Sequence, residues 1–274
     1  MTEKKKETPD IKTLYGKYAG VFWERLFKGH IHSGICEPGE DIPIHEAAMR
    51  FTDMLIEKVP LKEGQRFLDV GCGVGLPALE LVKRKGCQVD GVNITSEQVE
   101  QANETAQREN LEHLAKFYVA DAIKLPFEEN TFDGGWFFDS ISHMPRQQVY
   151  REACRTLKPG SFLFVTDSGI PKELLTQEDN HFLINELFIT SPTSKKDYPD
   201  LLKKTGFELV EFKELSYVNE MTFRKIVEGV EEYRDDLLKM GGNGLYDYLR
   251  DFMWKMYEIY GKKFDCFLII VKKR

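Results

Sequence analysis

The sequence lacks the signals that would place the chain in a membrane, on a secretory route or among disulfide-rich proteins. It has no apolar run long enough to cross a bilayer and no hydrophobic segment behind the starting Met, so we expect a cytoplasmic protein without a membrane span. Cysteine is scarce, with five residues: Cys36, Cys72, Cys87, Cys154 and Cys266. Because their number is odd and no C-x-x-C pair occurs, we expect reduced, mostly buried thiols rather than disulfides.

Clustered basic charge is also lacking. The 274 residues include 38 Lys and Arg against 45 Asp and Glu, a net charge of −7, and basic runs such as Lys4-Lys5-Lys6 are no longer than three residues. Nucleic-acid binding needs clustered Lys and Arg, so we expect no nucleic-acid partner. A hydrophobic fraction of 42% with 30% charged residues is ordinary for a globular protein, and one substantial core accounts for a chain of this length.

A short apolar strand, residues 66–70, is followed by a glycine-rich turn with the sequence Gly71-Cys72-Gly73-Val74-Gly75. Glycines at alternate positions let the backbone bend sharply and approach a ligand, and the helix that follows offers free N–H groups at its start. A dinucleotide site has Gly-x-Gly-x-x-Gly, whereas here the third glycine comes one residue early and Asp69 precedes the first. A carboxylate there repels phosphate, so the turn favours a positively charged ligand.

Helix and strand signals alternate over much of the chain. Apolar spacing predicts helices over residues 44–59, 76–85, 97–109, 146–157 and 197–205, and strands over 66–70, 88–93, 115–120, 132–138, 161–167, 207–217 and 264–271. We expect a side-chain cap from Thr95-Ser96-Glu97, a turn at Lys158-Pro159-Gly160 and a less regular helical segment over 170–190. Such alternation predicts a parallel sheet that binds ligands at the carboxyl ends of its strands.

Residues 219–261 interrupt this alternation before the final strand. They predict two helices with apolar faces, one over 223–238 and one over 245–256, with a hinge at Gly241-Gly242-Asn243-Gly244. Two interpretations remain open for this insertion. It is either a hairpin packed on the edge of the sheet or a helical lid over an acceptor site.

The Asp-x-Gly-x-Gly-x-Gly pattern resembles that of class I S-adenosylmethionine-dependent methyltransferases. The resemblance implies a Rossmann-like α/β fold whose seven-stranded sheet is mostly parallel with an antiparallel last strand, together with a helical cap. We divide the chain into an N-terminal lid segment (1–43), a core (44–218 plus 262–274) and a capping insertion (219–261). The implied cofactor is S-adenosyl-L-methionine, giving S-adenosyl-L-homocysteine, and the implied partner is a small-molecule acceptor. A homodimer stays open.

The resemblance also assigns cofactor-binding residues. Asn93 stands where the family has an acidic residue for the ribose hydroxyls, and Asp121-Ala122 match the adenine contacts. The neutral Asn93 and the helix that carries Gln98 resemble the branch that includes sterol, tocopherol, prenyl-diphosphate and deoxysugar methyltransferases. Alternatively, Gln98 lies on a solvated helix face and Asp121 forms a turn. The full set is Asp69, Gly71, Gly73, Gly75, Asn93, Ile94, Gln98, Asp121, Ala122, Phe138 and His32.

The segment His30–Cys36 resembles the His-x-Gly-aromatic-Trp segment that the same branch places over the cofactor. His32 and Gly34 match, whereas Ile35 and Cys36 replace the aromatic pair. No neighbouring residue completes a metal-ligand set with the His-x-His pair, so we expect no metal. Four aromatic residues precede the segment: Tyr15, Tyr18, Phe22 and Trp23. They either close over the cofactor's sulfonium or pack into the core.

The candidate catalytic residues follow two neighbouring strands. Residues 138–145 resemble the Glu-Ser-x-x-His-Met-Pro stretch of the natural-product branch, which makes His143 the candidate general base. Asp167 ends the next strand and would orient His143 or the acceptor hydroxyl. Alternatively, His143 caps the following helix and Asp167 closes a turn. Asp139 is a further candidate as a positioning carboxylate.

We therefore expect methylation of a small, partly apolar acceptor at a hydroxyl, by in-line displacement in a dry site. A prenyl alkene is an alternative acceptor, in which case Asp139 or Asp167 would stabilise a carbocation. An amine is a second alternative acceptor, and because its deprotonation would cost little, removal of His143 would then hardly matter. Two further alternatives are a nicotinamide oxidoreductase, which the glycine spacing disfavours, and a cofactor-binding scaffold without catalysis.

Overall fold

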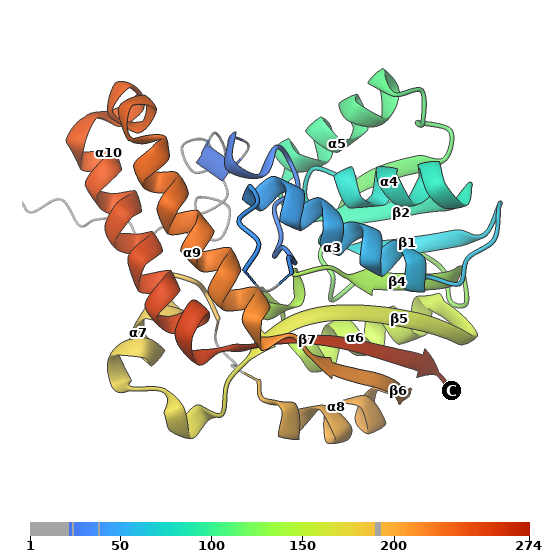
Figure 1. Ribbon diagram of the computed structural model, residues 1–274. Helices are drawn as coiled ribbons and strands as arrows, with labels where there is room; N and C mark the ends of the chain where they lie inside the picture. Colours follow the sequence, from blue (N-terminus) through green and yellow to red (C-terminus); the bar gives the residue numbers. More distant parts are fainter. Residues whose placement is uncertain (1–21, 24, 38, 190–192) are drawn as a thin grey trace, which may run out of the picture.

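The computed structural model describes residues 22–23, 25–37, 39–189 and 193–274. Its central sheet has seven strands in the order β3-β2-β1-β4-β5-β7-β6 (Figure 1). Strands β1 to β5 pair in parallel, and β7 runs antiparallel to its neighbours β5 and β6. This confirms the α/β fold expected from the sequence, with its antiparallel last strand. Tyr15, Tyr18 and the basic run Lys4–Lys6 lie outside the described residues.

The strands are β1 (Arg66–Val70), β2 (Gln88–Asn93), β3 (Ala115–Val119), β4 (Phe132–Phe137), β5 (Leu157–Gly169), β6 (Phe207–Glu214) and β7 (Asp265–Lys273). The α-helices are α3 (Ile44–Lys58), α4 (Leu76–Lys85), α5 (Ser96–Arg108), α6 (Arg146–Thr156), α7 (Gln177–Asn185), α8 (Tyr198–Thr205), α9 (Ser216–Glu232) and α10 (Arg234–Met256). A π-helical turn, Tyr257–Gly261, follows α10. In the described residues no helix is long and apolar enough to cross a membrane.

The insertion differs in detail from its prediction. Strand β6 ends at Glu214 and α9 begins at Ser216, so the helical part starts earlier than residue 219. The two helices meet at Tyr233, and the expected glycine hinge is a kink inside α10, where Gly242 has φ 67°. Helical segments continue on both sides of this glycine because Leu237 and Leu249 are both buried, and their packing outweighs the low helix propensity of glycine.

Two local predictions are corrected as well. Thr95 occupies the N-cap position of α5, but its side chain makes no capping hydrogen bond, so the side-chain cap predicted there is wrong. Strand β5 begins directly at Leu157, and the expected turn lies inside its irregular start, where Gly160 has φ 81° and the pairing with β4 shifts register. Leu157 pairs with Phe132 and Phe162 pairs with Gly134, so the turn forms between two paired positions without ending the strand.

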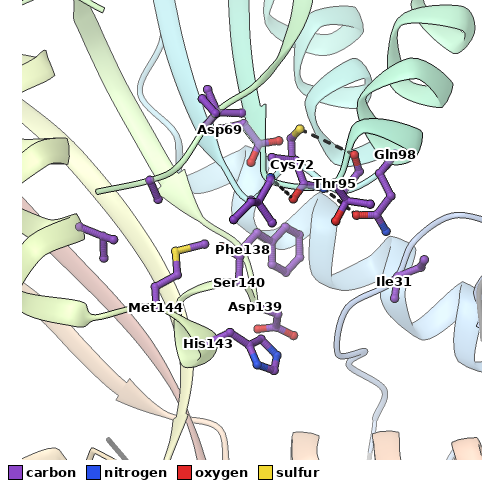
Figure 2. A pocket seen from close by; sticks show the side chains of 18 of the residues that line it. Ile31, Asp69, Cys72, Thr95, Gln98, Phe138, Asp139, Ser140, His143 and Met144 are labelled. Atoms are coloured by element: carbon purple, nitrogen blue, oxygen red, sulfur yellow. Dashed lines mark hydrogen bonds between the residues drawn. The ribbon is translucent and has the colours of Figure 1, made fainter. Parts of the chain in front are cut away.

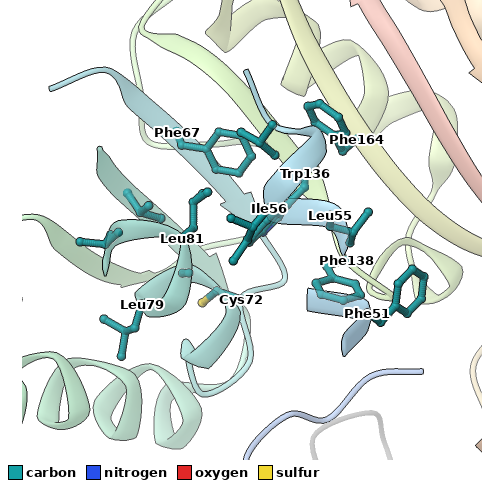
Figure 3. Packing of buried hydrophobic residues seen from close by; sticks show 14 of the residues in the cluster. Phe51, Leu55, Ile56, Phe67, Cys72, Leu79, Leu81, Trp136, Phe138 and Phe164 are labelled. Atoms are coloured by element: carbon teal, nitrogen blue, oxygen red, sulfur yellow. The ribbon is translucent and has the colours of Figure 1, made fainter. Parts of the chain in front are cut away.

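Helices cover both faces of the sheet. On one face α3, α4 and α5 bury an apolar cluster that includes Phe51, Leu79 and Trp136 (Figures 1 and 3). On the other face α6 and α8 bury a second apolar cluster. A third apolar cluster joins the N-terminal aromatic residues Phe22 and Trp23 to α9 and α10. Because the strand order reverses between β1 and β4, the carboxyl ends of these strands open a crevice, which is where α/β sheets bind ligands.

Candidate active site

The glycine-rich turn after β1 is packed tightly on one side and open on the other. Gly71 has φ 81°, and a Cβ atom there would lie 2.4 Å from the Cβ atom of Ser140. Ser140 is fixed in turn, because its hydroxyl donates to the carbonyl of Val70 at 2.6 Å. Gly73 has φ 53° and no heavy atom within 4 Å of where its Cβ would stand. The turn is thus anchored to the end of β4 at Gly71 and leaves space beside Gly73.

Because of this difference, we expect alanine substitutions at Gly71 and Gly73 to lower the free energy of unfolding by unequal amounts. Gly73→Ala should lower the free energy of unfolding of the ligand-free protein by about 1 kcal/mol, the cost of a left-handed backbone for a residue with a Cβ. Gly71→Ala should lower it by about 3 kcal/mol or more, because the clash with Ser140 adds to that strain. Urea unfolding of both variants measures the difference, and equal losses would contradict the tight packing at Gly71.

A cavity of about 510 Å³ opens above the turn (Figure 2). Its wall contains all but one of the residues assigned to the cofactor by resemblance: Asp69, Gly71, Gly73, Asn93, Ile94, Gln98, Asp121, Ala122, Phe138 and His32. Gly75 is the exception and is corrected here. It has φ 82° at the N-cap of α4, and a Cβ atom there would lie 2.7 Å from the ring of Phe117 and 3.0 Å from Ala102. Its role is close packing of the turn, not lining the cavity.

Asp69 is buried at the end of β1 beside this cavity, only 2% exposed. Burial raises the pKa of its carboxyl to about 7, and the neighbouring indole of Trp136 opposes the rise only in part. Among the described residues no Lys or Arg side chain forms an ion pair with Asp69. A buried carboxylate that lacks a protein cation and faces a cavity fits a ligand that brings its own positive charge.

The far side of the cavity is formed by the ends of β2 and β3. The amide of Asn93 donates to Oε1 of Gln98 at 2.6 Å, and its oxygen accepts from the backbone N–H of Ile94 at 2.8 Å. The Gln98 side chain therefore faces the cavity with Asn93 and is not simply part of a solvated surface. Asp121 accepts from the N–H of Ile123 at 3.0 Å, so it forms the turn given as its alternative role and also lines the cavity.

His32 closes the cavity from the N-terminal side. Its ring stacks on Phe138 with centroids 4.0 Å apart, and burial lowers its pKa to about 3, so it is neutral. Both ring nitrogens have partners, because Nδ1 is 2.8 Å from the carbonyl of Ser33 and Nε2 is 3.1 Å from the hydroxyl of Thr52. A neutral histidine with both nitrogens engaged shapes the wall and does not transfer protons.

A second, smaller cavity of about 140 Å³ adjoins the first. Four residues line both cavities: Ile31, His32, Asp139 and His143. The second cavity is otherwise bounded by the ends of β4 and β5, by the N-terminal aromatic residues Trp23 and Phe27, and by side chains of α9 and α10. Phe22 instead packs into the adjoining apolar cluster. The two cavities thus adjoin each other and share part of their lining.

His143 belongs to this shared wall and lies in a 3₁₀ turn, Ile141–His143, after β4. Figure 2 shows its imidazole at the opposite end of the larger cavity from Asp69. Its Nδ1 is 2.9 Å from the carbonyl oxygen of Leu187, so Nδ1 carries the proton and donates. Burial lowers the pKa of His143, and the nearby Arg146 guanidinium lowers it further. Helix α6 has Pro145 at its N-cap and no side-chain cap, so the interpretation of His143 as a helix cap is wrong.

Asp167 is not placed to orient His143, which corrects that expectation. Its carboxylate accepts two bonds from the Arg146 guanidinium, from Nε at 2.7 Å and from Nη2 at 2.9 Å, and a third from the hydroxyl of Tyr198. The backbone N–H of Ser168 adds a fourth at 2.8 Å. The Asp167 side chain is fully buried, and this network satisfies both of its oxygens, so its role is structural: it neutralises a buried arginine beneath the site.

The structural role of Asp167 can be tested with Tyr198→Phe, which should change stability but not the pH dependence of the reaction. Loss of a hydroxyl that donates to a buried carboxylate should lower the free energy of unfolding by about 2 kcal/mol. The pH profile of the reaction should stay unchanged, because Asp167 remains paired with Arg146. Chemical denaturation and initial rates across pH measure the two effects. A shifted profile with unchanged stability would return Asp167 to the catalytic machinery.

Asp139 joins the N-terminal segment to the sheet. It has φ 48°, and one carboxylate oxygen accepts from the backbone N–H of Ser33 at 2.7 Å. The other oxygen accepts from the hydroxyl of Thr166, which itself accepts from the Asp139 N–H at 2.7 Å. Gly34 extends this attachment toward the cap, because its N–H donates to the hydroxyl of Thr222 in α9 at 3.1 Å.

Some residues of the site could not be found from the sequence. The carbonyl of Leu187 that orients His143 lies 44 residues downstream, and Phe188, with φ 56°, reaches the first cavity from the same loop. Arg146 and Tyr198, the partners of Asp167, stood in predicted helices without any motif. The sequence shows only an arginine at the start of one predicted helix and an aspartate at the end of one predicted strand, which does not indicate that the two side chains meet.

Comparisons with known proteins agree with this geometry. Residues 68–165 match a family model described as "Methyltransferase domain". The (+)-O-methylkolavelool synthase of Herpetosiphon aurantiacus is 34% identical over 268 residues, covering 97% of this chain and 94% of that protein. The 27-O-demethylrifamycin SV methyltransferase of Amycolatopsis mediterranei is 31% identical over 238 residues, covering 85% and 87%.

The solved structure of the [4+2]-cyclase SpnF has the same fold, with a TM-score of 0.81 at 24% identity over 96% of this chain and 94% of that one. The motif, the carboxylate-lined cavity and these relatives lead to one conclusion. The chain belongs to the class I S-adenosyl-L-methionine-dependent methyltransferases, enzymes that use S-adenosyl-L-methionine to methylate small molecules and release S-adenosyl-L-homocysteine.

Proposed function

We propose that this enzyme methylates a hydroxyl group of a small-molecule acceptor and that His143 is the general base. The observation that supports this most directly is the position of His143 in the wall shared by the two cavities. A group there contacts an acceptor in the smaller cavity on the side that faces the cofactor. A hydroxyl must lose its proton as it becomes methylated, and a histidine is suited to accept it near neutral pH.

The hydrogen bond of His143 supports the base role. Because Nδ1 donates to the Leu187 carbonyl, Nε2 carries the lone pair that can accept a proton. The lowered pKa keeps the imidazole neutral at pH 7, as a base must be before it acts. S-adenosyl-L-methionine supplies an electrophilic methyl group on its sulfonium. The contribution of the protein is to hold the acceptor oxygen in line in a cavity that excludes water.

We assign the cofactor contacts to the wall of the larger cavity. Asp69 pairs with a positive charge of the cofactor, Asn93 and Gln98 face the ribose, and Asp121 with Ala122 faces the adenine. Gly71 and Gly73 let the backbone approach, while Ile94, Phe138 and His32 supply apolar contacts. All of these residues line one cavity, which supports their grouping.

We also propose that different segments of the chain cover the cofactor and the acceptor. The N-terminal segment to residue 43 covers the cofactor, and the insertion covers the acceptor. Ser33 bonded to Asp139 and Gly34 bonded to Thr222 support the first role. Side chains Phe223, Phe252 and Tyr260 in the smaller cavity support the second, and favour a lid over a hairpin on the sheet edge.

The names of the two relatives support a hydroxyl acceptor, since one is an O-methyl product synthase and the other acts on an O-demethyl compound. A direct test incubates the protein with methyl-labelled S-adenosyl-L-methionine and alcohols, amines and alkenes of matched skeleton. We expect label only in ether products. Label in amines or alkenes would support the alternative acceptors. Tight S-adenosyl-L-homocysteine binding without transfer to any acceptor would indicate a non-catalytic protein or another reaction, as the cyclase with this fold illustrates.

A further inference from the structure

The smaller cavity has two chemically different ends. At the sheet edge it is lined by polar groups, including Ser142, His143 and Thr166. Its apolar lining comes from the N-terminal segment and the helical insertion, whose side chains pack in one cluster: Trp23, Phe27, Phe223, Ile226, Phe252 and Tyr260. Such a gradient positions a molecule with its polar group against the sheet and its hydrocarbon part between the helices.

Among the described lining residues of this cavity, the side chains of Asp139 and Asp167 are carboxylates. Its described lining residues include no Lys or Arg, and the nearby Arg146 is held by Asp167 in a two-pronged ion pair. Asp139 contributes a carboxylate that neither accepts from a Lys or Arg nor forms an ion pair with one among the described residues. An anionic head group would therefore meet a like charge and find no cation to bind it.

Positive charge on the acceptor is disfavoured for a different reason. Because His143 and Asp139 line both cavities, a cationic head group beside them would be repelled by the positively charged sulfonium of a cofactor in the larger cavity. This repulsion opposes the attraction that the Asp139 carboxylate would exert on the same group. The polar end of the cavity suits a neutral group that can both donate and accept hydrogen bonds.

We propose that the acceptor is an uncharged alcohol with a hydrocarbon body, and that Asp139 is the specificity-determining residue that excludes anionic acceptors. This inference rests on the proposed function, since it names the acceptor class of the same site. The hydrocarbon body lies between the N-terminal aromatic residues and helices α9 and α10. The hydroxyl lies beside His143 and Asp139.

The test compares three probes with one skeleton, geraniol, geranyl monophosphate and geranylamine, each titrated into the full-length protein saturated with S-adenosyl-L-homocysteine. Calorimetry gives the dissociation constants without any need for turnover. We expect geraniol to bind about tenfold or more tighter than the monophosphate, because the Asp139 carboxylate lines the cavity and no Lys or Arg among the described lining residues offsets its charge. We expect the amine to bind more weakly than the alcohol when a sulfonium-bearing analogue replaces S-adenosyl-L-homocysteine.

Asp139→Asn isolates the charge, because an amide oxygen can still accept from Ser33 or Thr166. This variant should reduce the discrimination against the monophosphate at least about fivefold while the affinity for geraniol changes by less than about threefold. Asp235→Asn, at a side chain that is 86% exposed on α10, is the matched control and should change neither affinity.

The outcomes separate the two proposals. Monophosphate binding as tight as geraniol binding overturns the acceptor class, and so does amine binding as tight as geraniol binding in the presence of the sulfonium-bearing analogue. The absence of binding by all three probes overturns it as well. Discrimination that survives unchanged in a folded Asp139→Asn protein overturns the role of Asp139. Geraniol binding with the expected preference, but no methylation of any alcohol, supports the acceptor class and contradicts the proposed O-methylation.

Discussion

Replacing His143 with alanine should lower the rate constant for methylation of an alcohol by about 100- to 10,000-fold, which corresponds to about 3 to 5 kcal/mol in the activation barrier. The reason is that the hydroxyl then has no positioned base to accept its proton. Affinity for S-adenosyl-L-homocysteine should change little, because His143 lies at the far end of the cavity from Asp69. Single-turnover rates on an alcohol substrate and calorimetric titration measure the two quantities.

Two further variants test the interpretation. His143→Asn keeps an N–H that can donate toward the Leu187 carbonyl but has no basic nitrogen, so it should be as inactive as the alanine variant. Recovery of activity in the asparagine variant would show that the hydrogen bond, not the base, is what matters. His113→Ala, at an exposed position outside both cavities, is the control and should retain full activity.

The same base predicts the pH dependence of the wild-type enzyme. Because the pKa of His143 lies below its usual 6.5, the imidazole is already neutral at pH 7. At saturating cofactor, kcat should therefore be flat around neutrality and fall only as acid protonates the base. Protonation of His143 also destabilises the folded state, because its pKa is lowered on folding, so rates should be measured where the protein remains folded.

Asp69→Asn should weaken cofactor binding by about 30-fold to several thousandfold, about 2 to 5 kcal/mol, because a buried charge pair loses one partner. An amide has nearly the same shape as a carboxylate, so the effect isolates the charge. Asp90→Asn is the matched control. Asp90 is also buried, on the neighbouring strand β2, but it bonds to Arg66 at 2.6 Å and does not line the cavity. That variant should lose stability and keep its cofactor affinity.

The pKa of Asp69 adds a pH signature. Its value of about 7 in the folded protein exceeds its ordinary 3.8, so the folded state binds the extra proton between these pH values. The resulting stability is fully present below pH 3.8 and is lost as the pH rises from 3.8 through 7, in total about 4 kcal/mol in the ligand-free protein. Asp69→Asn should abolish this loss, of which about 1.4 kcal/mol falls between pH 6 and pH 8, where urea unfolding measures it.

Cofactor binding should depend on pH in the opposite sense. A cationic ligand prefers the ionised carboxylate, so the affinity should fall as pH decreases below 7, approaching about tenfold per pH unit. Binding at pH 6 should therefore release protons into buffer, which calorimetry in two buffers detects. An affinity that is constant from pH 5.5 to 8 in the wild type would contradict the pairing of Asp69 with the cofactor.

The sequence by itself determined the order of helices and strands, the glycine turn and therefore the fold and the cofactor. These are short-range properties. Helical and strand periodicities follow from the backbone, and Gly71 and Gly73 are required where φ is positive. The helical periodicity of the insertion also located it in the sequence. The boundary between its two helices at Tyr233 was not found, because packing on both sides keeps the glycine-rich stretch largely helical.

Only the tertiary structure decided what the polar side chains do. Asp167 and His143 both lie at the expected edge of the sheet, but Asp167 bonds to Arg146 and Tyr198, 21 residues before it and 31 after it. The proton of His143 is fixed by a carbonyl 44 residues away. A hydrogen bond or ion pair forms with whichever partner the fold brings within about 3 Å, and spacing along the chain does not encode that distance.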